Sequence, residues 1–379
     1  MKFFKLLKKY LRICLLRGPF FGFWLKCKVQ KLERIYLTAL VENSRLGKPR
    51  QSPFLALGSS VKRVLLISDV QWENRHLVPE LGKICPVDVL DLNSSLKGVA
   101  DKSELSERVV SGVNEFCKNE RIADPSIILF YARPELLSDE VFDVIRKRWR
   151  SPILGLNLDD KIEFLDHRVF SARNDNYQRW AKCFDLNLTS VRAVYDWYVD
   201  HNLPSYYMPA GYHPMFSGPL LDATFHRDLS FVGSWRPERE KMVNSLRRHG
   251  VWIDVFGSGW PDGRRCNDPE RVYRESQLNL GLGFASPSEK ITSLKARDFE
   301  CPGSGACYLT TYNWELALHF EIGKEILCYR SVEELIELIS FYRRRPDECI
   351  KISVAAYNRC LREHTWEKRF RKLFAETGM

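Results

Sequence analysis

Short apolar segments alternate with helix-like stretches through the first half of the chain. The apolar segments are 62–68, 87–92, 126–131 and 152–157, and helix-like stretches cover about 103–119 and 138–149. Because helices between such segments can cover both faces of a sheet of parallel strands, the alternation predicts an α/β fold. The run CFDLNLTS from Cys183 predicts a further strand. The segment 209–219, punctuated by Pro and Gly, predicts a linker that ends near 217–225.

The length of the chain fits two domains. With 379 residues it exceeds the usual domain size of about 100–200 residues. We therefore expect a basic N-terminal segment at 1–50, a first Rossmann-like domain at 60–217, a second at 226–363 and a closing helix at 364–379. The eleven cysteines are widely spaced and include no CxxC pair, which indicates reduced thiols and no zinc site. No P-loop, GxGxxG fingerprint or HExxH motif is present.

The segment KARDFECPGSGACYLTT, from Lys295 to Thr311, carries most of the chemical information. Upstream, Ser286 to Glu289 has the pattern of a capping box with Pro287 at the first helical position, which predicts a helix from there. Ser293, Arg297 and Glu300 would share one face of that helix. The glycines at 303 and 305 would end the helix, and 306–310 would form the next strand.

These residue types suit a nucleotide. A helix N-terminus favours a phosphate group, Lys295 and Arg297 can neutralise a diphosphate, and a carboxylate such as Glu300 can accept hydrogen bonds from a ribose diol. The alternative is an ordinary surface pair between Arg297 and Glu300, worth about 0.2–0.5 kcal/mol. Spacing alone leaves both interpretations open.

The second half of the chain resembles a known family from Asp228 to Phe374. The matching pieces, in order, are LSFVGSWRPERE, VFGSGW, YRESQLNLGLG, RDFECPGSGACYLTTY, GKEILCYRSVEELIELISFYRRRPDE and HTWEKRFRKLF. They are similar to the C-terminal domain of glycosyltransferases of the GT-B fold, in the group related to the spore-maturation protein CgeB within the set called glycosyl transferases group 1. The resemblance implies two Rossmann-like domains that face a cleft.

The resemblance also implies roles for single residues. Glu300 matches the second glutamate of the family's paired-glutamate motif, which holds the ribose. Arg236 and Arg239 lie where basic residues contact the diphosphate of the donor, Gly233 lies in the same loop, and Lys295 and Arg297 would add positive charge there. Gly305 matches a small residue that lets the helix approach the following strand. The first glutamate of the motif is replaced by Thr292, which leaves the transferred sugar and catalytic competence open.

Two loops of the first domain are candidates for the acceptor side, because ligands bind beyond the carboxyl ends of strands in open α/β sheets. In the loop 68–72, Trp72 can stack on a sugar. In the loop 157–161, Asp159 or Asp160 can act as a general base. The alternatives are core packing for the tryptophan and helix capping for the aspartates.

The N-terminal segment carries the whole net charge of +10. Residues 1–50 hold thirteen Lys/Arg and two acidic residues, whereas the rest of the chain holds 45 basic and 46 acidic residues. Aromatic and leucine side chains alternate with these charges, and no apolar run approaches the roughly 20 residues of a membrane-spanning helix. We expect residues 1–35 to lie on an anionic membrane surface as a basic amphipathic helix. Packing on the protein itself and a nucleic-acid arm are the alternatives, and we expect no nucleic-acid partner.

The function expected from residues and resemblance together is sugar transfer. The chain would move a sugar from a nucleotide-diphosphate sugar to an acceptor hydroxyl, with retention of configuration and without a metal or another cofactor. A cytoplasmic location on the inner membrane face would favour a lipid-linked or surface-polysaccharide acceptor. The alternative is a membrane-associated scaffold that kept the GT-B fold and lost the chemistry, which Thr292 favours.

Overall fold

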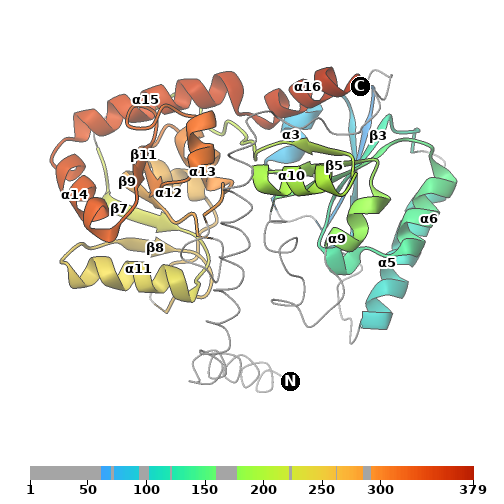
Figure 1. The fold of residues 1–379 in the computed structure, drawn as a ribbon, viewed down its shortest axis with the longest axis horizontal. Helices are drawn as coiled ribbons and strands as arrows, with labels where there is room; N and C mark the ends of the chain where they lie inside the picture. The colour runs from blue at the N-terminus through green and yellow to red at the C-terminus, as the bar shows by residue number, and fades with distance from the viewer. Residues whose placement is uncertain are drawn as a thin grey trace.

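The computed structural model describes residues 61–69, 72–93, 102–119, 122–158, 177–221, 224–261, 263–284 and 292–379. These residues form two parallel sheets, each packed against helices (Figure 1). The predicted α/β class with two parallel-sheet domains is confirmed. The predicted amphipathic segment 1–50 lies outside the described residues.

The first sheet has six strands in the order β2-β1-β3-β4-β5-β6, and all of its neighbouring pairs are parallel. Its strands are β1 (Val64–Ser68), β2 (Val87–Asp91), β3 (Ile127–Tyr131), β4 (Ile153–Asn157), β5 (Leu186–Thr189) and β6 (Ser205–Tyr207). The predicted apolar segments thus correspond to β1 to β4, and the run from Cys183 contains β5. Every residue of β1 is buried, as expected for a strand covered on both faces.

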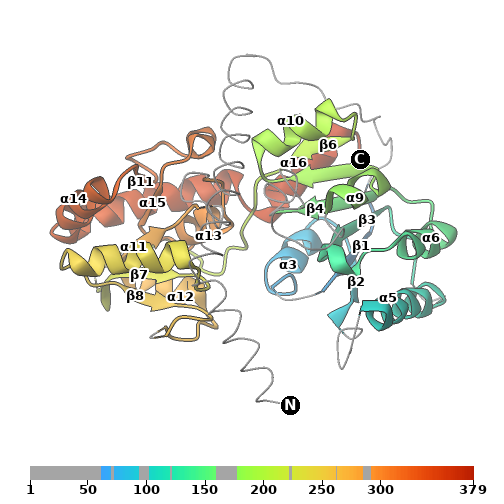
Figure 2. The same ribbon diagram turned by 60° about the horizontal axis from the view of Figure 1, so that its bottom comes forward.

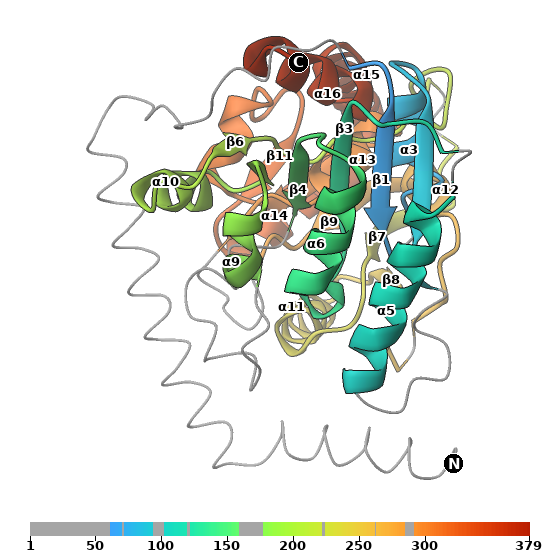
Figure 3. The same ribbon diagram turned by 90° about the vertical axis from the view of Figure 1, so that its right-hand side faces the viewer.

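Helices cover this sheet on two sides because successive side chains of a strand point to opposite faces. Leu65 and Ile67 pack with α5 and α6, whereas Val64 and Leu66 pack with α3 and the C-terminal helix. Figure 3 shows α5 and α6 in front of the strands of this sheet. The helical elements of this half are α3 (Leu77–Gly82), α5 (Lys102–Cys117), η1 (Pro134–Leu136), α6 (Asp139–Arg148), α9 (Tyr177–Trp180), η2 (Ala181–Cys183) and α10 (Arg192–Asp200).

The second sheet has five strands in the order β11-β10-β9-β7-β8, again all parallel. Its strands are β7 (Arg227–Val232), β8 (Asp254–Phe256), β9 (Ser276–Gly281), β10 (Tyr308–Thr311) and β11 (Leu327–Tyr329). The helical elements that accompany it are α11 (Pro237–Arg248), α12 (Pro269–Arg274), α13 (Arg297–Gly303), η3 (Trp314–Leu318), α14 (Val332–Arg343) and α15 (Pro346–Glu363).

The C-terminal helices join the two halves. After α15, which packs on α13, the chain turns at Thr365 and α16 (Trp366–Thr377) packs against α3 of the first half (Figure 2). The linker passes beside this turn: the Tyr212 N–H donates to the carbonyl of His364, and the Trp366 N–H donates to the carbonyl of Tyr212. These contacts thus join the first half, with the loop after β1, to the second half, with the loop after β7.

Candidate functional site

The helix that carries Arg297 and Glu300 is short. The predicted start at Pro287 is wrong, because α13 begins at Arg297 and Thr292 pairs instead in a β-bridge with Phe284. The capping residues expected at 286–289 lie outside the described residues. The start is set by Asp298, whose carboxylate accepts from the Lys295 N–H at 2.7 Å and from the Tyr308 hydroxyl at 2.9 Å. Arg297 and Glu300 therefore sit in the first turn, while Ser293 precedes the helix.

Two guanidinium groups converge on Gly233, which directly follows β7. The Arg297 guanidinium lies 5.0 Å from the ring centroid of Phe231, and the Arg239 guanidinium lies 5.7 Å from the same ring. A methyl group built on Gly233 would lie 2.5 Å from Nη2 of Arg297 and 3.3 Å from Nη1 of Arg239. Arg297 thus meets Gly233 and Arg239 through the order of the sheet, although it lies far from them in the sequence.

This guanidinium pair has the features of an anion site. Like charges held close together repel each other, and a bound anion relieves the repulsion. Arg239 also donates to the carbonyl of Ser234 at 2.8 Å, which fixes its direction. Nε of Arg297 is buried and has no hydrogen-bond partner among the described residues. The pair can therefore offer several N–H donors to one phosphate or diphosphate.

The other predicted basic residues lie at the border of this pair. Arg236 occupies the position before the first residue of α11, and its side chain is exposed. Lys295 lies two residues before α13 and is half-buried. Both can contribute long-range positive charge, but the close contacts around Gly233 are made by Arg239 and Arg297.

Glu300 is half-buried, and its pKa is raised to about 7. Burial is the main cause, the negative charge of Glu270 adds to it, and the positive charge of Arg297 opposes it. Among the described residues, no hydrogen bond to the Glu300 carboxylate occurs, so its oxygens remain available to donors such as ribose hydroxyls.

Glu270 is a neighbour that the sequence analysis missed. It lies in the first turn of α12 and is 3% exposed, and burial raises the pKa of its carboxyl. Its closest basic side chains come from the first domain, where Nη2 of Arg75 lies 3.5 Å from Oε2 and Nε2 of His76 lies 3.6 Å from Oε1. In the sequence, Asp268-Pro269-Glu270 has only the pattern of a helix start. No local signal therefore indicated that the charge of Glu270 acts on Glu300.

Gly305 has a different function from the one expected. Its φ of +76° lies in the left-handed region, and a methyl group there would lie 2.8 Å from Cα of Pro219. Arg274 donates to the carbonyls of Gly218 and Ser304 at 2.8 and 2.9 Å. The close approach at Gly305 is therefore to the linker and not to the following strand.

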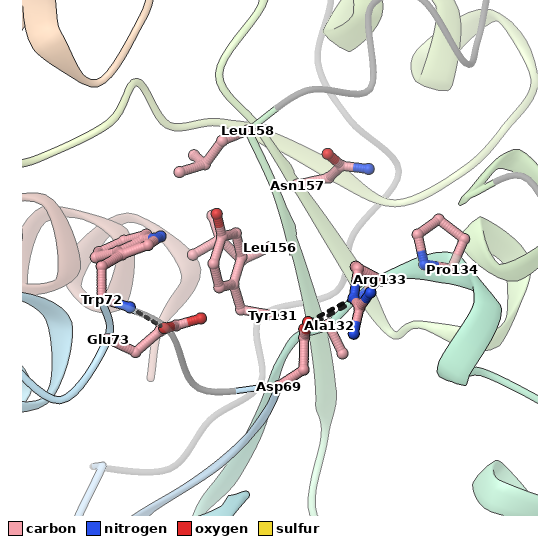
Figure 4. A pocket seen from close by; sticks show the side chains of 10 residues that line it. All are labelled: Asp69, Trp72, Glu73, Tyr131, Ala132, Arg133, Pro134, Leu156, Asn157 and Leu158. Carbon is pink, nitrogen blue, oxygen red and sulfur yellow. Dashed lines mark hydrogen bonds and ion pairs between the residues drawn. The ribbon is translucent and has the colours of Figure 1, made fainter. Parts of the chain in front are cut away.

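A cavity of about 250 Å³ lies at the carboxyl ends of β1, β3 and β4 (Figure 4). Trp72 lines it, as expected for the acceptor side, and also stacks on Trp366 with ring centroids 6.0 Å apart. The packing of Trp72 on Trp366 agrees with the core-packing alternative, and stacking of Trp72 on a sugar stays a prediction. Asp159 and Asp160 lie outside the described residues, while Asn157 and Leu158 directly before them line the cavity.

Three charged residues of this cavity were also missed. Asp69 is 4% exposed and accepts from Nε of Arg133 at 2.6 Å. Glu73 is 2% exposed; its carboxylate accepts from the Ser68 hydroxyl at 2.7 Å and from the Trp72 N–H at 2.8 Å. Asp69 directly follows a predicted strand within the loop 68–72, and Glu73 lies one residue beyond that loop, so the position after the strand was the one available signal.

In the part of the chain that the structure describes, no group of His, Cys, Asp and Glu side chains could hold a metal ion. No helix there is long and apolar enough to cross a membrane. The nine described cysteines are free thiols.

Known proteins match the chain in two ways. Residues 236–375 match the family described as glycosyl transferase-like. Among solved structures, the chain is similar to Anabaena HepE in complex with UDP and glucose, with 12% identity, a TM-score of 0.58 and coverage of 84% of this chain and 99% of that one. Sucrose-phosphate synthase from Thermosynechococcus elongatus has 12% identity, a TM-score of 0.55 and coverage of 83% and 100%. A glycosyltransferase from Rickettsia africae has 10% identity, a TM-score of 0.53 and coverage of 84% and 98%.

No curated protein sequence matches the chain. At these identities the solved structures establish the fold, and the family match covers the half that contains Arg239, Arg297 and Glu300. The grouping with CgeB-related proteins stays a prediction. Residues 236–375 thus match a glycosyl transferase-like family, and the chain as a whole shares the two-domain fold of these solved structures.

Proposed function

We propose that the protein transfers a sugar from a nucleotide-diphosphate sugar to an acceptor hydroxyl. The observation that carries this proposal is the convergence of Arg239 and Arg297 on Gly233, together with the half-buried carboxylate of Glu300, whose pKa the charge of Arg297 affects. A diphosphate suits the guanidinium pair, and a ribose diol suits the carboxylate. The structural similarity to HepE, whose structure holds UDP and glucose, makes UDP the first nucleotide to test.

On the donor side, the guanidinium pair stabilises the negative charge that develops on the departing diphosphate. Fixed cations in a site shielded from water do this without a metal ion. Arg236 and Lys295 add to the same positive field from the border of the site. Glu300 orients the nucleotide, and we propose retention of the anomeric configuration as the family resemblance implies.

On the acceptor side, the loop that begins at Asn157 leads to Asp159 and Asp160, our candidates for taking the proton of the acceptor hydroxyl. A lipid-linked or surface-polysaccharide acceptor agrees with the basic N-terminus. We propose that residues 1–35 hold the enzyme on the cytoplasmic face of the inner membrane.

A scaffold that binds nucleotide without turnover is the second candidate. Thr292 favours it, because its hydroxyl donates to the carbonyl of Tyr312 at 3.5 Å at the position where relatives carry a glutamate. Hydrolysis or transfer of a nucleotide sugar by the purified protein separates the two candidates, since the scaffold predicts binding alone.

A thermal-shift panel of UDP, GDP, dTDP, ADP and CMP, with and without magnesium, tests the proposed function. A ligand present at 100 times its dissociation constant stabilises a protein by about 2.7 kcal/mol. We expect one nucleoside diphosphate to raise the Tm without metal, and Arg239→Gln and Glu300→Gln to reduce that shift. Arg248→Gln, on the exposed last turn of α11, is the matched control. If no nucleotide shifts the Tm of wild type, donor binding at this site is wrong.

A further inference from the structure

The ring of Phe231 is the surface that both members of the guanidinium pair approach. Phe231 is fully buried at the end of β7, and the guanidinium groups of Arg297 and Arg239 lie 5.0 and 5.7 Å from its ring centroid. Both distances are within the roughly 6 Å over which the face of an aromatic ring attracts a cation. One uncharged side chain thus contacts both cations of the proposed diphosphate site.

Arg297 depends on this ring more than Arg239 does. Arg239 is also directed by its hydrogen bond to the carbonyl of Ser234. For Arg297, no hydrogen bond and no ion pair occurs among the described residues. The negative charge of an ionised Glu300 attracts the Arg297 guanidinium. The attraction of the ring face opposes this pull and keeps the guanidinium beside Gly233.

Trp260, in the loop after β8, holds the ring and the glycine together. It is buried, and its ring meets that of Phe231 edge to face, with centroids 5.9 Å apart and an angle of 71° between the ring planes. Nε1 of Trp260 donates to the carbonyl of Gly233 at 2.8 Å, and the Gly233 N–H donates to the carbonyl of Phe256 at 2.8 Å. Both peptide groups of Gly233 are therefore fixed by β8 and the loop that follows it.

We propose that Phe231 and Trp260 are positioning residues of the diphosphate site. Phe231 holds the Arg297 guanidinium beside Gly233, and Trp260 holds the Phe231 ring and the Gly233 carbonyl. The site is then arranged before an anion arrives, so that less conformational entropy is lost on binding. The proposal rests on the proposed function, since it names the residues that prepare the donor site of that function.

Inorganic pyrophosphate probes the diphosphate site without the rest of the donor. We would titrate the full-length protein with pyrophosphate and with the nucleoside diphosphate found in the thermal-shift panel, by calorimetry, and measure binding of the corresponding nucleoside by saturation-transfer NMR. Phe231→Leu removes the ring face and should weaken both anions about fivefold or more. The nucleoside, which carries no phosphate, should bind as it does to wild type.

Trp260→Phe tests the proposal even if Phe231→Leu does not fold, because it keeps an aromatic ring and removes the N–H donor. It should weaken both anions about threefold or more, by the loss of one neutral hydrogen bond. Each variant has a control with the same substitution at an exposed site. These controls are Phe341→Leu, at a ring that is 46% exposed with the Arg345 guanidinium 3.8 Å from its centroid, and Trp252→Phe, at a ring that is 64% exposed. Both controls should bind pyrophosphate as wild type does.

The outcomes separate the two proposals. Binding of the nucleoside diphosphate that the folded variants leave unchanged, or weaken only as much as they weaken the nucleoside, would overturn the positioning role and leave the proposed function standing. Pyrophosphate binding that falls in the variants of a protein that binds no nucleoside diphosphate would support the positioning role and contradict the proposed function. A wild-type protein that binds neither pyrophosphate nor a nucleoside diphosphate would overturn both.

Discussion

Glu300 shows how neighbours set the state of a single carboxyl group. Burial and the charge of Glu270 raise its pKa to about 7, far above its ordinary value of 4.5. At neutral pH the group is therefore poised between the protonated and ionised forms. A nucleotide that donates hydroxyl hydrogen bonds favours the ionised form, so its binding should release a proton.

The folded protein holds this proton up to about pH 7, whereas the unfolded chain releases it near 4.5. The contribution of Glu300 to the free energy of unfolding is therefore largest below about pH 4.5. It falls as the pH rises from about 4.5 to about 7. We expect Glu300→Gln to gain stability relative to wild type as the pH rises from 5 to 8, measured as the Tm difference at each pH. His76 and the other groups with shifted pKa values are present in both proteins, so their contributions largely cancel in the Tm difference. Parallel pH profiles would show that the pKa of Glu300 is ordinary.

Gly233 matters because of the space it leaves. A methyl group there would lie 2.5 Å from Nη2 of Arg297 and 2.9 Å from the Phe231 ring, so Gly233→Ala should displace the guanidinium. Loss of one charge-assisted hydrogen bond costs about 1.5–3 kcal/mol, or about tenfold or more in affinity. Titration calorimetry with the nucleoside diphosphate identified in the thermal-shift panel measures this loss of affinity.

Gly283→Ala is the control for this variant, because its nearest atom outside the chain neighbours lies 3.6 Å away. Equal nucleotide affinities in Gly233→Ala and Gly283→Ala would place the diphosphate elsewhere.

At the scale of elements, the end of α13 and the linker form one packed unit. Arg274 bonds the carbonyls of both, its guanidinium lies 4.5 Å from the ring centroid of Phe216, and the Tyr357 hydroxyl donates to the Phe216 carbonyl at 3.1 Å. The linker from 216 to 221 is thus fixed to the second domain. Bending between the domains is expected nearer Tyr212, where α15 gives way to α16.

Gly305→Ala tests this unit. The left-handed φ costs a residue with a side chain about 1–2 kcal/mol, and contact with Cα of Pro219 adds a steric cost. Gly323→Ala has a φ of +89° but meets no atom within 4 Å, so it isolates the conformational cost. Urea unfolding should show a clearly larger loss of stability for Gly305→Ala. Equal losses would mean that the linker moves aside freely.

At the scale of the whole molecule, the loop 72–76 lies between the two sites. Trp72 lines the cavity of the first domain, and its ring meets that of His76 at 5.9 Å. His76 and Arg75 in turn approach Glu270 beside Glu300, and Arg75 donates to the Asn267 carbonyl at 2.8 Å. The proposed donor site and the cavity of the first domain are thus joined by direct contacts.

The N-terminal segment has its own test. Each basic residue near an anionic membrane contributes about 1 kcal/mol before screening by salt. The full-length chain should sediment with vesicles that contain anionic lipid at low salt, and a chain lacking residues 1–35 should stay in solution. Neutral vesicles are the control. Sedimentation of the shortened chain with anionic vesicles would rule out docking through this segment.

The sequence by itself determined the class of the fold and the positions of many elements. Strand β1 and helix α6 lie within the predicted 62–68 and 138–149 because burial and helical periodicity are local properties of a few successive side chains. The N-cap of α6 is a local contact too, since the Ser138 hydroxyl accepts from the N–H of Val141, three residues away. The residue types around 295–300 and the resemblance together supplied the candidate residues on α11 and α13.

Only the tertiary structure decided which of these residues meet. Arg297 meets Gly233 and Arg239 because β9 lies between β7 and β10 in the sheet, and Glu270 comes near Glu300 because α12 packs on α13. The start of α13 was mispredicted because Asp298, held by Tyr308 of the next strand, decides it. Asp69, Glu73 and Arg133 form one cavity through the pairing of β1 with β3. Such contacts depend on sheet order, a long-range property that no short window of sequence contains.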